Sequence, residues 1–274
     1  MWVNKKELLS LSAGIRAALD GQPFDPRDNR EGAFSILKND IYTLTHSGRE
    51  QRNVLEEEKE RLAKHLSDIS HQLKTPISSI LLMTELMSDA PEKTQRDFLL
   101  SIKKEIRHME WLVSVLLKMA KLDSSVVNFH AEEVSVSLLL KEALKSLDII
   151  LDIRSQTVRL SHDMSLSCDK KWTVEAMINL LKNASECSGK DSEIVIDSGQ
   201  NPLYDWISVT DAGEGLNMEQ MAGLFRRFEG SQKENGYGIG LPLALSVMRA
   251  QNGDIEVSPG GNGVGATFCM KFYK

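Results

Sequence analysis

His71 is the residue whose position best suits a nucleophile. It follows Ile69 by two places in a heptad pattern of apolar residues, so we expect it on the outward face of a helix. An exposed imidazole is mostly neutral at cytosolic pH, which leaves its lone pair available for attack. The same helix face carries several polar residues: Ser67, Asp68, Lys74, Thr75 and Ser78. Taken alone, His71 could equally be an ordinary exposed histidine.

Three polar residues recur at every fourth position of another helical segment. Glu175, Asn179 and Asn183 therefore form one ridge along that helix. The amide oxygen of asparagine is a hard ligand, of the kind that Mg²⁺ takes in sites it shares with phosphates. An exposed polar face explains the same spacing, and on spacing alone it is the simpler interpretation.

An aspartate with two glycines follows an apolar strand candidate. Asp211 could accept a hydrogen bond from an amine such as that of adenine, while Gly213 and Gly215 let the backbone approach a flat ring. The pattern Asp-x-Gly-x-Gly is also a common turn, so by itself it indicates little.

A second glycine motif opens a helix that has Pro242 in its first turn. Its members are Gly236, Gly238, Gly240 and Leu241. A glycine loop at a helix N-terminus presents backbone N–H groups to phosphate. The motif lies near the C-terminus and not after the first strand of a βαβ unit, which excludes the dinucleotide fingerprint. No Gly-Lys-Ser/Thr is present, so the Walker phosphate loop is excluded as well.

Two long helices are expected to position His71. The first should cover residues 50–88, and its apolar residues alternate in steps of four and three: Leu62, Leu66, Ile69, Leu73, Pro76, Ile80, Met83 and Met87. Pro76 is expected to kink it. The second has the same spacing: Leu99, Ile102, Ile106, Met109, Val113, Leu116 and Ala120. A hairpin this thin cannot bury its apolar stripe, so we expect a homodimer with an antiparallel four-helix bundle.

Shorter elements flank this hairpin. Residues 5–48 predict two short amphipathic helices separated by a stretch rich in glycine and proline. After residue 130 the pattern predicts strands at 158–160, 193–197, 206–210, 254–257 and 266–272, and helices at 138–152, 171–186, 218–225 and 241–252. Helices interleaved with a mixed sheet predict an α/β sandwich.

Composition excludes several classes of protein. The net charge of −6 argues against a nucleic-acid-binding protein, which needs a basic surface. Three widely spaced cysteines without a Cys-x-x-Cys argue against a disulfide framework or a zinc site and favour a reducing cytosol. No apolar run reaches the roughly 18 residues of a membrane span. Lys5 and Lys6 fit the cytoplasmic flank of a membrane helix and an ordinary helix start equally well.

In order along the chain, these motifs resemble those of sensor histidine kinases. Ser70-His71-Gln-Leu-Lys-Thr75-Pro76 is similar to the phosphoacceptor box, and Asn179-Leu-Leu-Lys-Asn183 to the N box. The first and second glycine boxes are matched by the motifs at 211–215 and 236–241, the F box by 225–228 and the closing strand by 265–268. Six motifs in order over residues 55–274 make a chance match improbable.

The resemblance implies a fold and a set of roles. The fold is a dimeric four-helix bundle carrying His71, followed by a Bergerat-type ATP-binding α/β sandwich. Asn183 would hold Mg²⁺, with Asn179 close to the phosphates. Asp211 would bind adenine, helped through water by Gly215 and Thr267. Residues 228–238 would form a short lid over the phosphates. The nearest cations would be Arg227, just before this lid, and Lys233, within it.

It also implies a domain order and partners. Residues 1–49 would be a two-helix relay similar to a HAMP domain, 50–128 the dimerisation and phosphotransfer hairpin, and 129–274 the catalytic domain. The chain would be the cytoplasmic part of a bacterial inner-membrane sensor, attached through a segment outside this sequence. Its partner would be the receiver domain of a response regulator.

The sequence departs from the family pattern beside the histidine. The acidic residue that commonly follows the histidine is Gln72 here, whose amide oxygen could accept the Nδ1 proton and leave Nε2 to attack the γ-phosphorus of ATP. Asp68, one turn earlier, could supply the missing charge. Thr75 occupies the family position for removing phosphate from the partner.

Two other functions fit parts of the pattern. An ATPase of the same nucleotide fold would carry a glutamate base where this chain has Asn179, a poor base for activating water. A dimeric scaffold with an inactive nucleotide site would not need the intact Asn183, Asp211 and glycines.

Overall fold

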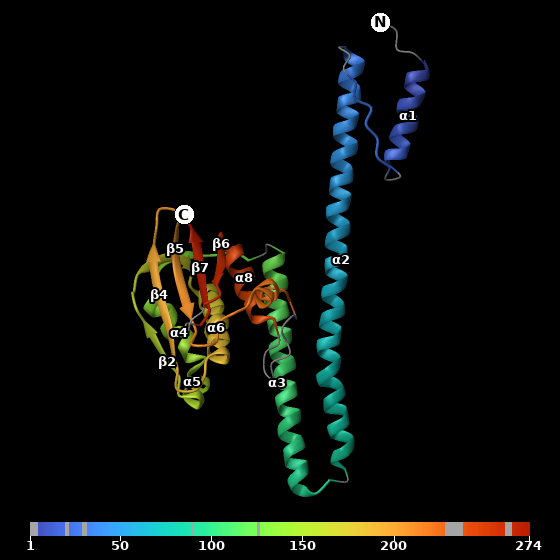
Figure 1. The fold of residues 1–274 in the computed structure, drawn as a ribbon. Coiled ribbons are helices and arrows are strands. Elements are labelled where there is room, and N and C mark those ends of the chain that lie inside the picture. Colours follow the sequence, from blue (N-terminus) through green and yellow to red (C-terminus); the bar gives the residue numbers. More distant parts are fainter. Residues whose placement is uncertain are drawn as a thin grey trace. The chain divides into compact units, whose positions relative to one another are not determined.

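The structure is a computed structural model, and it describes residues 5–19, 22–28, 32–88, 90–124, 127–227, 238–260 and 265–274 (Figure 1). It divides into one unit of residues 1–74 and another of residues 75–274. Among the described helices, none combines the length and apolar content that a bilayer span requires.

The first unit contains helix α1 (Lys5–Leu19) and most of helix α2 (Ala33–Met87). The connector between them packs on both helices. Phe24 lies so close to Gly14 that a Cβ there would come within 1.9 Å of its ring, and the Arg27 guanidinium lies 3.7 Å from the centroid of the Tyr42 ring. Both segments predicted to be helical within residues 5–48 are helical, but the second is the start of the long helix α2 and not a short helix.

The break expected between a short helix ending near residue 48 and a long helix starting near residue 50 is absent, because α2 is one continuous helix through this region. Residues 45–60 are polar but contain no proline, and Gly48 alone costs too little to interrupt a helix. The helix also continues through Pro76 to Met87.

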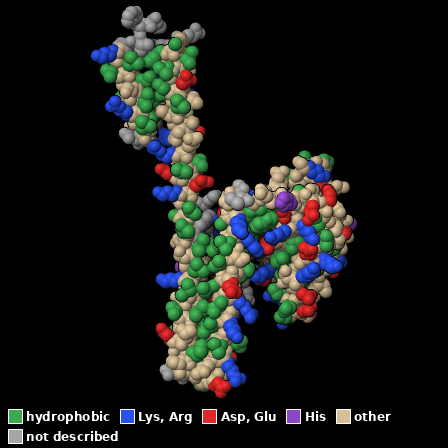
Figure 2. All heavy atoms as spheres, turned by 180° about the vertical axis from the view of Figure 1, so that it is seen from behind, with side chains coloured by type: hydrophobic (Ala, Val, Ile, Leu, Met, Phe, Trp, Pro, Cys, Tyr) green, Lys and Arg blue, Asp and Glu red, His purple; other side chains and the backbone are tan. Residues whose placement is uncertain are grey.

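Helix α3 (Glu92–Asp123) follows a turn at Pro91. Apolar side chains gather along the long helices (Figure 2), and many are more than half exposed, among them Leu66, Leu81 and Leu117. The C-terminal half of α3 differs from the predicted stripe, since Leu112, Val115, Met119 and Leu122 are the buried residues there. These four pack on the α/β domain, which contacts α3 through helix α8 (Gly240–Ala250).

The α/β domain is built on a five-stranded sheet in the order β2-β4-β5-β7-β6. Its strands are β2 (Thr157–Leu160), β4 (Glu193–Gln200), β5 (Tyr204–Thr210), β6 (Gly253–Ser258) and β7 (Thr267–Tyr273). Only β2 and β4 are parallel. All five correspond to predicted strands.

Helices α4 (Val136–Lys145), α6 (Lys170–Cys187) and α8 lie against one face of the sheet (Figure 1). Alternate strand residues such as Ile194, Ile207 and Phe268 point into this layer and are buried. The predicted long helical region followed by an α/β sandwich is thereby confirmed.

Three details differ from the prediction. The helix expected at 138–152 is two helices, α4 and α5 (Asp148–Arg154), because the chain turns at Ser146 and buries Leu147. Helix α7 (Met218–Gly223) ends two residues early. Strands β1 (Ala131–Ser135) and β3 (Ser165–Asp169) were not predicted, and they pair with each other in a separate two-stranded sheet.

Candidate functional site

Helix α6 carries the polar ridge predicted from the sequence. Its N-cap, Asp169, accepts a hydrogen bond from Trp172 N at 3.0 Å. The opposite face is apolar and fully buried, with Ala176, Met177, Leu180, Leu181 and Ala184 packed beneath the sheet and α8. This packing leaves the ridge residues Glu175, Asn179 and Asn183 half-buried at the surface of the domain.

Asn179 lies directly against the start of α8. A Cβ at Gly240 would come within 2.9 Å of Asn179 Oδ1, so only glycine fits there without displacing the asparagine. Asn179 Nδ2 donates to the carbonyl of Glu175 at 2.8 Å, which orients the amide. The N-terminus of α8 therefore lies directly beside the asparagine ridge.

Asp211 stands just past the end of β5 and is 6% exposed. Its Oδ1 accepts hydrogen bonds from Gly213 N at 2.8 Å and from Ala266 N at 3.1 Å. A Cβ at Gly265 would lie 2.0 Å from the same oxygen. The aspartate is therefore held in one orientation by backbone donors, in a space that two glycines keep open.

The loop after Asp211 is joined to three other elements. Ala212 N donates to Ser188 Oγ at 2.9 Å, next to the end of α6. Gly215 has a φ of +83° and lies so close to the Pro259 carbonyl, past β6, that a side chain would collide with it. The Thr210 and Thr267 hydroxyls are 2.9 Å apart across β5 and β7.

The structure thus brings most of the predicted nucleotide-site residues into one domain. Asn179, Asn183 and Gly240 lie on one side, and Asp211, Gly213, Gly215 and Thr267 on the other, connected through α6. Gly238, with a φ of +63°, lies just before α8, and Leu241 lies in the first turn of this helix. Lys233 and Gly236, together with Phe228, fall outside the described residues.

Arg227 is described, and it forms an ion pair that was not predicted. Its Nη2 donates to Asp123 of α3 at 2.9 and 3.2 Å. Lys118 of α3 likewise donates to Glu175 on the ridge at 2.7 Å, and Lys182 lies 5.3 Å from the centroid of the Trp111 ring. Partners tens of residues apart leave no local sequence signal, so these contacts could not be read from spacing.

The residues of the phosphoacceptor box lie on α2. His71 and Thr75 are exposed and Gln72 is half-buried, as the heptad argument predicts for an outward-facing histidine. Asp68 precedes His71 by three residues and is half-buried, so both occupy the same side of the helix.

Comparisons with known proteins match the same two regions. Residues 61–125 match the His Kinase A (phospho-acceptor) domain, and residues 168–274 match the histidine kinase-, DNA gyrase B-, and HSP90-like ATPase family. His71 falls in the first region, and Asn179, Asn183 and Asp211 fall in the second.

Among curated proteins, the two-component sensor PhoQ of Pseudomonas aeruginosa is 27% identical over 249 residues, covering 89% of this chain and 53% of its own length. The chain spans about half the length of the curated relatives it matches.

Two solved structures have the same fold. The Acinetobacter baumannii histidine kinase AdeS has a TM-score of 0.61 and 21% identity, covering 74% of this chain and 97% of that one. The histidine kinase ThkA, in complex with the response regulator protein TrrA, has a TM-score of 0.59 and 18% identity, covering 90% and 68%. With both domain types present in order, the chain belongs to the sensor histidine kinases of two-component systems.

Proposed function

We propose that this chain binds ATP with Mg²⁺, phosphorylates itself on His71 and passes the phosphoryl group to an aspartate of a response regulator. The proposal depends most on the burial and the backbone hydrogen bonds of Asp211. A buried carboxylate held by two backbone N–H groups and surrounded by glycines is suited to receive a hydrogen-bond donor from a flat ring. The adenine amino group is such a donor.

The residues present fit the nucleotide. A carboxylate can accept about four hydrogen bonds, so Asp211 can bind adenine while it keeps its backbone donors. Thr267, hydrogen-bonded to Thr210, and Gly215 lie beside it and would contact the ring through water. Because Gly240, directly beside Asn179, has no side chain, phosphate oxygens would be able to approach the first turn of α8 closely.

The donors for Mg²⁺ are the amide oxygens on the ridge. Asn183 would coordinate the ion, and Asn179, whose Nδ2 is held by the Glu175 carbonyl, presents its Oδ1 towards α8 and the phosphates. When bound, the ion neutralises the charge of the phosphate oxygens. Arg227 and Lys233 would add positive charge at the same place.

His71 would be the nucleophile. Its Nε2 lone pair forms a bond to the γ-phosphorus in line with the departing oxygen of ADP, and the bond between that oxygen and phosphorus breaks. Gln72, with its amide oxygen accepting the Nδ1 proton, would hold the tautomer in which Nε2 carries the lone pair. Asp68, on the same side of α2, would favour the positive charge that develops on the ring.

Thr75 would take part in a second activity, the removal of phosphate from the response regulator. It is exposed one turn after His71. We expect Thr75→Ala to lose most of this phosphatase activity while keeping self-phosphorylation. Ser78→Ala, another exposed hydroxyl of α2, is the matched control, and dephosphorylation by Thr75→Ala at the wild-type rate would refute the role.

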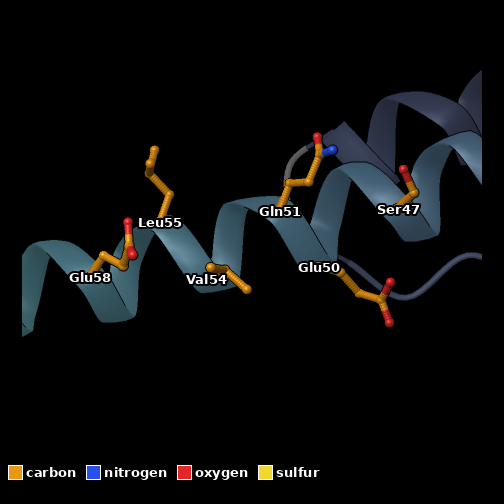
Figure 3. Close-up of a pocket in the computed structure, with 6 residues that line it drawn as sticks. All are labelled: Ser47, Glu50, Gln51, Val54, Leu55 and Glu58. Atoms are coloured by element: carbon orange, nitrogen blue, oxygen red, sulfur yellow. The ribbon is translucent and has the colours of Figure 1, made fainter. Parts of the chain in front are cut away.

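The chain would act as a homodimer. The apolar residues left exposed on α2 and α3 are the surface that a second copy would cover. The same holds nearer the N-terminus, where six residues lining a shallow hollow all project from α2 alone (Figure 3). Val54 and Leu55 among them are exposed, so this hollow is the open groove of an uncovered helix.

The domain division is inferred from the sequence motifs. Residues 1–49 would be the relay, 50–128 the dimerisation hairpin and 129–274 the catalytic domain. Because α2 is continuous from Ala33 to Met87, the relay would move His71 through one rigid helix. The named relative is a two-component sensor, and we infer attachment to the bacterial inner membrane through a segment preceding α1.

Incubation with γ-labelled ATP tests the proposal. The wild-type chain should become labelled in an acid-labile form, and His71→Gln should abolish the label while nucleotide binding is kept. His46→Gln, an exposed histidine of the same helix, is the matched control. Release of free phosphate without labelled protein would identify an ATPase instead, and the absence of both would identify an inactive scaffold.

A further inference from the structure

The C-terminal half of α3 is covered by the catalytic domain. Leu112, Val115, Met119 and Leu122 are each less than 8% exposed and face this domain, which contacts α3 through α8. These residues recur at three- and four-residue spacing, so they form a second apolar stripe on α3. The contact is thus an extended packed surface.

Two ion pairs flank this apolar surface, and both reach elements of the nucleotide site. Lys118 pairs with Glu175, the first residue of the asparagine ridge, at 2.7 Å. Asp123, in the last turn of α3, pairs with Arg227 at 2.9 Å. Five residues separate Lys118 from Asp123, or about 7.5 Å along the helix, so both ion pairs join the C-terminal part of α3 to this domain.

We propose that Asp123 competes with the phosphates of the nucleotide for Arg227, so that nucleotide binding and docking of the catalytic domain on α3 oppose each other. The inference rests on the proposed function, in which Arg227 lies at the phosphates. A guanidinium binds carboxylate and phosphate with the same planar array of donors. Pairing with Asp123 keeps the Arg227 side chain on α3 and offsets its charge.

The coupling between nucleotide binding and the contact with Asp123 is reciprocal. If Asp123 lowers the affinity for nucleotide, nucleotide must weaken the contact with Asp123 by the same factor. Binding of ATP would then loosen the end of α3 from the catalytic domain. The charge of Asp123 would set how strongly nucleotide binding and docking on α3 oppose each other.

The size of the effect follows from exposure. The Arg227 and Asp123 side chains are 24% and 51% exposed, so solvent screens the pair. Ion pairs of this kind contribute up to about 1 kcal/mol, and we therefore expect a change of about threefold to fivefold in nucleotide affinity. The effect should shrink as salt is added.

The test measures binding of a non-hydrolysable ATP analogue to the full chain by calorimetry. Asp123→Asn should tighten binding about threefold to fivefold, whereas Arg96→Gln, which breaks an exposed ion pair with Glu92 in the first turns of α3, should leave it within about 1.5-fold. In an Arg227→Gln background Asp123→Asn should have no effect. An unchanged affinity of Asp123→Asn, or equal tightening in the Arg227→Gln background, overturns the proposal.

Hydrogen exchange gives a second, independent readout. The analogue should speed amide exchange in the last two turns of α3 of the wild-type chain, and Asp123→Asn should exchange fast without it. Exchange that does not respond to nucleotide in the wild type also overturns the proposal. Failure of the proposed function would be seen separately, as absence of any analogue binding or of label on His71.

Discussion

The catalytic domain and the long helices bury their apolar residues to very different extents. Met177, Leu180, Ile194 and Phe268 in the α/β domain are each 1% exposed or less. Leu66, Leu81 and Leu117 on the helices are 56–58% exposed. Full burial of such a side chain is worth roughly 1.5–3 kcal/mol, so the helices retain a large unused driving force.

The two regions differ in which surface covers their apolar residues. The α/β domain finds its complement within one chain, and its sheet and helices close around a single core. The helices carry stripes whose complement is another apolar surface. Helix α3 has an apolar stripe of each kind. The catalytic domain covers the stripe of Leu112 and Met119, while Val113 and Leu117 stay exposed.

The largest expected effect concerns the uncovered stripe. Leu66→Glu would place a charge in the centre of the proposed dimer twice, once from each copy. Burying an unpaired charge costs several kcal/mol, so the dimer should weaken more than about a hundredfold, as measured by sedimentation. The melting of the catalytic domain should not change.

Lys64→Glu is the matched control for this change. It lies on the same helix at the heptad position equivalent to that of His71, which faces outward, so it should leave the dimer intact. A dimer of Leu66→Glu as tight as the wild type would show that the exposed stripe is not the dimer surface.

The next effect concerns the closed core. Phe268→Ala removes a ring that is 1% exposed near the start of β7, and it should cost about 3–5 kcal/mol of unfolding free energy. Leu203→Ala, at a residue 72% exposed in the same domain, should change stability by less than about 0.5 kcal/mol. Denaturant unfolding followed by tryptophan fluorescence measures both. Similar losses in the two variants would contradict the contrast between core and surface.

The sequence predicted what depends on local period. The five strands of the main sheet and helix α6 carry alternating or four-residue apolar patterns, and each was found. Strands β1 and β3 escaped because each is short and polar and is a strand only through pairing with the other, across more than 25 residues. The end expected near residue 49 reflected polar composition, which a helix supported by neighbouring turns tolerates.

The candidate site shows the same limit. Residue types and spacing made Asn179, Asn183 and Asp211 candidates, since each lies in a pattern that spans a few residues, and the family resemblance gave them their expected roles. The donors that orient Asp211 come partly from Ala266, and the partner of Arg227 comes from Asp123, 104 residues away. Such contacts are set by how elements pack, and no local pattern contains them.

The smallest effect tests whether the covered half of α3 behaves like core. His108 lies on this half, with Glu105 beside it at 3.9 Å and Lys182 of α6 nearby. Burial lowers the pKa of His108 below its ordinary value of 6.5; Lys182 acts in the same direction and Glu105 opposes it. The unfolded chain therefore binds a proton at this histidine more readily than the folded chain does.

Because the pKa of His108 is lowered in the folded chain, this histidine makes the folded state less stable at acidic pH. Above pH 6.5 the histidine is neutral in both states and has no effect, and as the pH falls below 6.5 the folded state loses stability until it too is protonated. We expect thermal melts of the wild-type chain to fall more between pH 7.5 and pH 5.5 than those of His108→Gln. His130→Gln, at an exposed histidine just before β1, should keep the wild-type slope. If His108→Gln keeps it too, the covered half of α3 is as open to water as the rest of the helix.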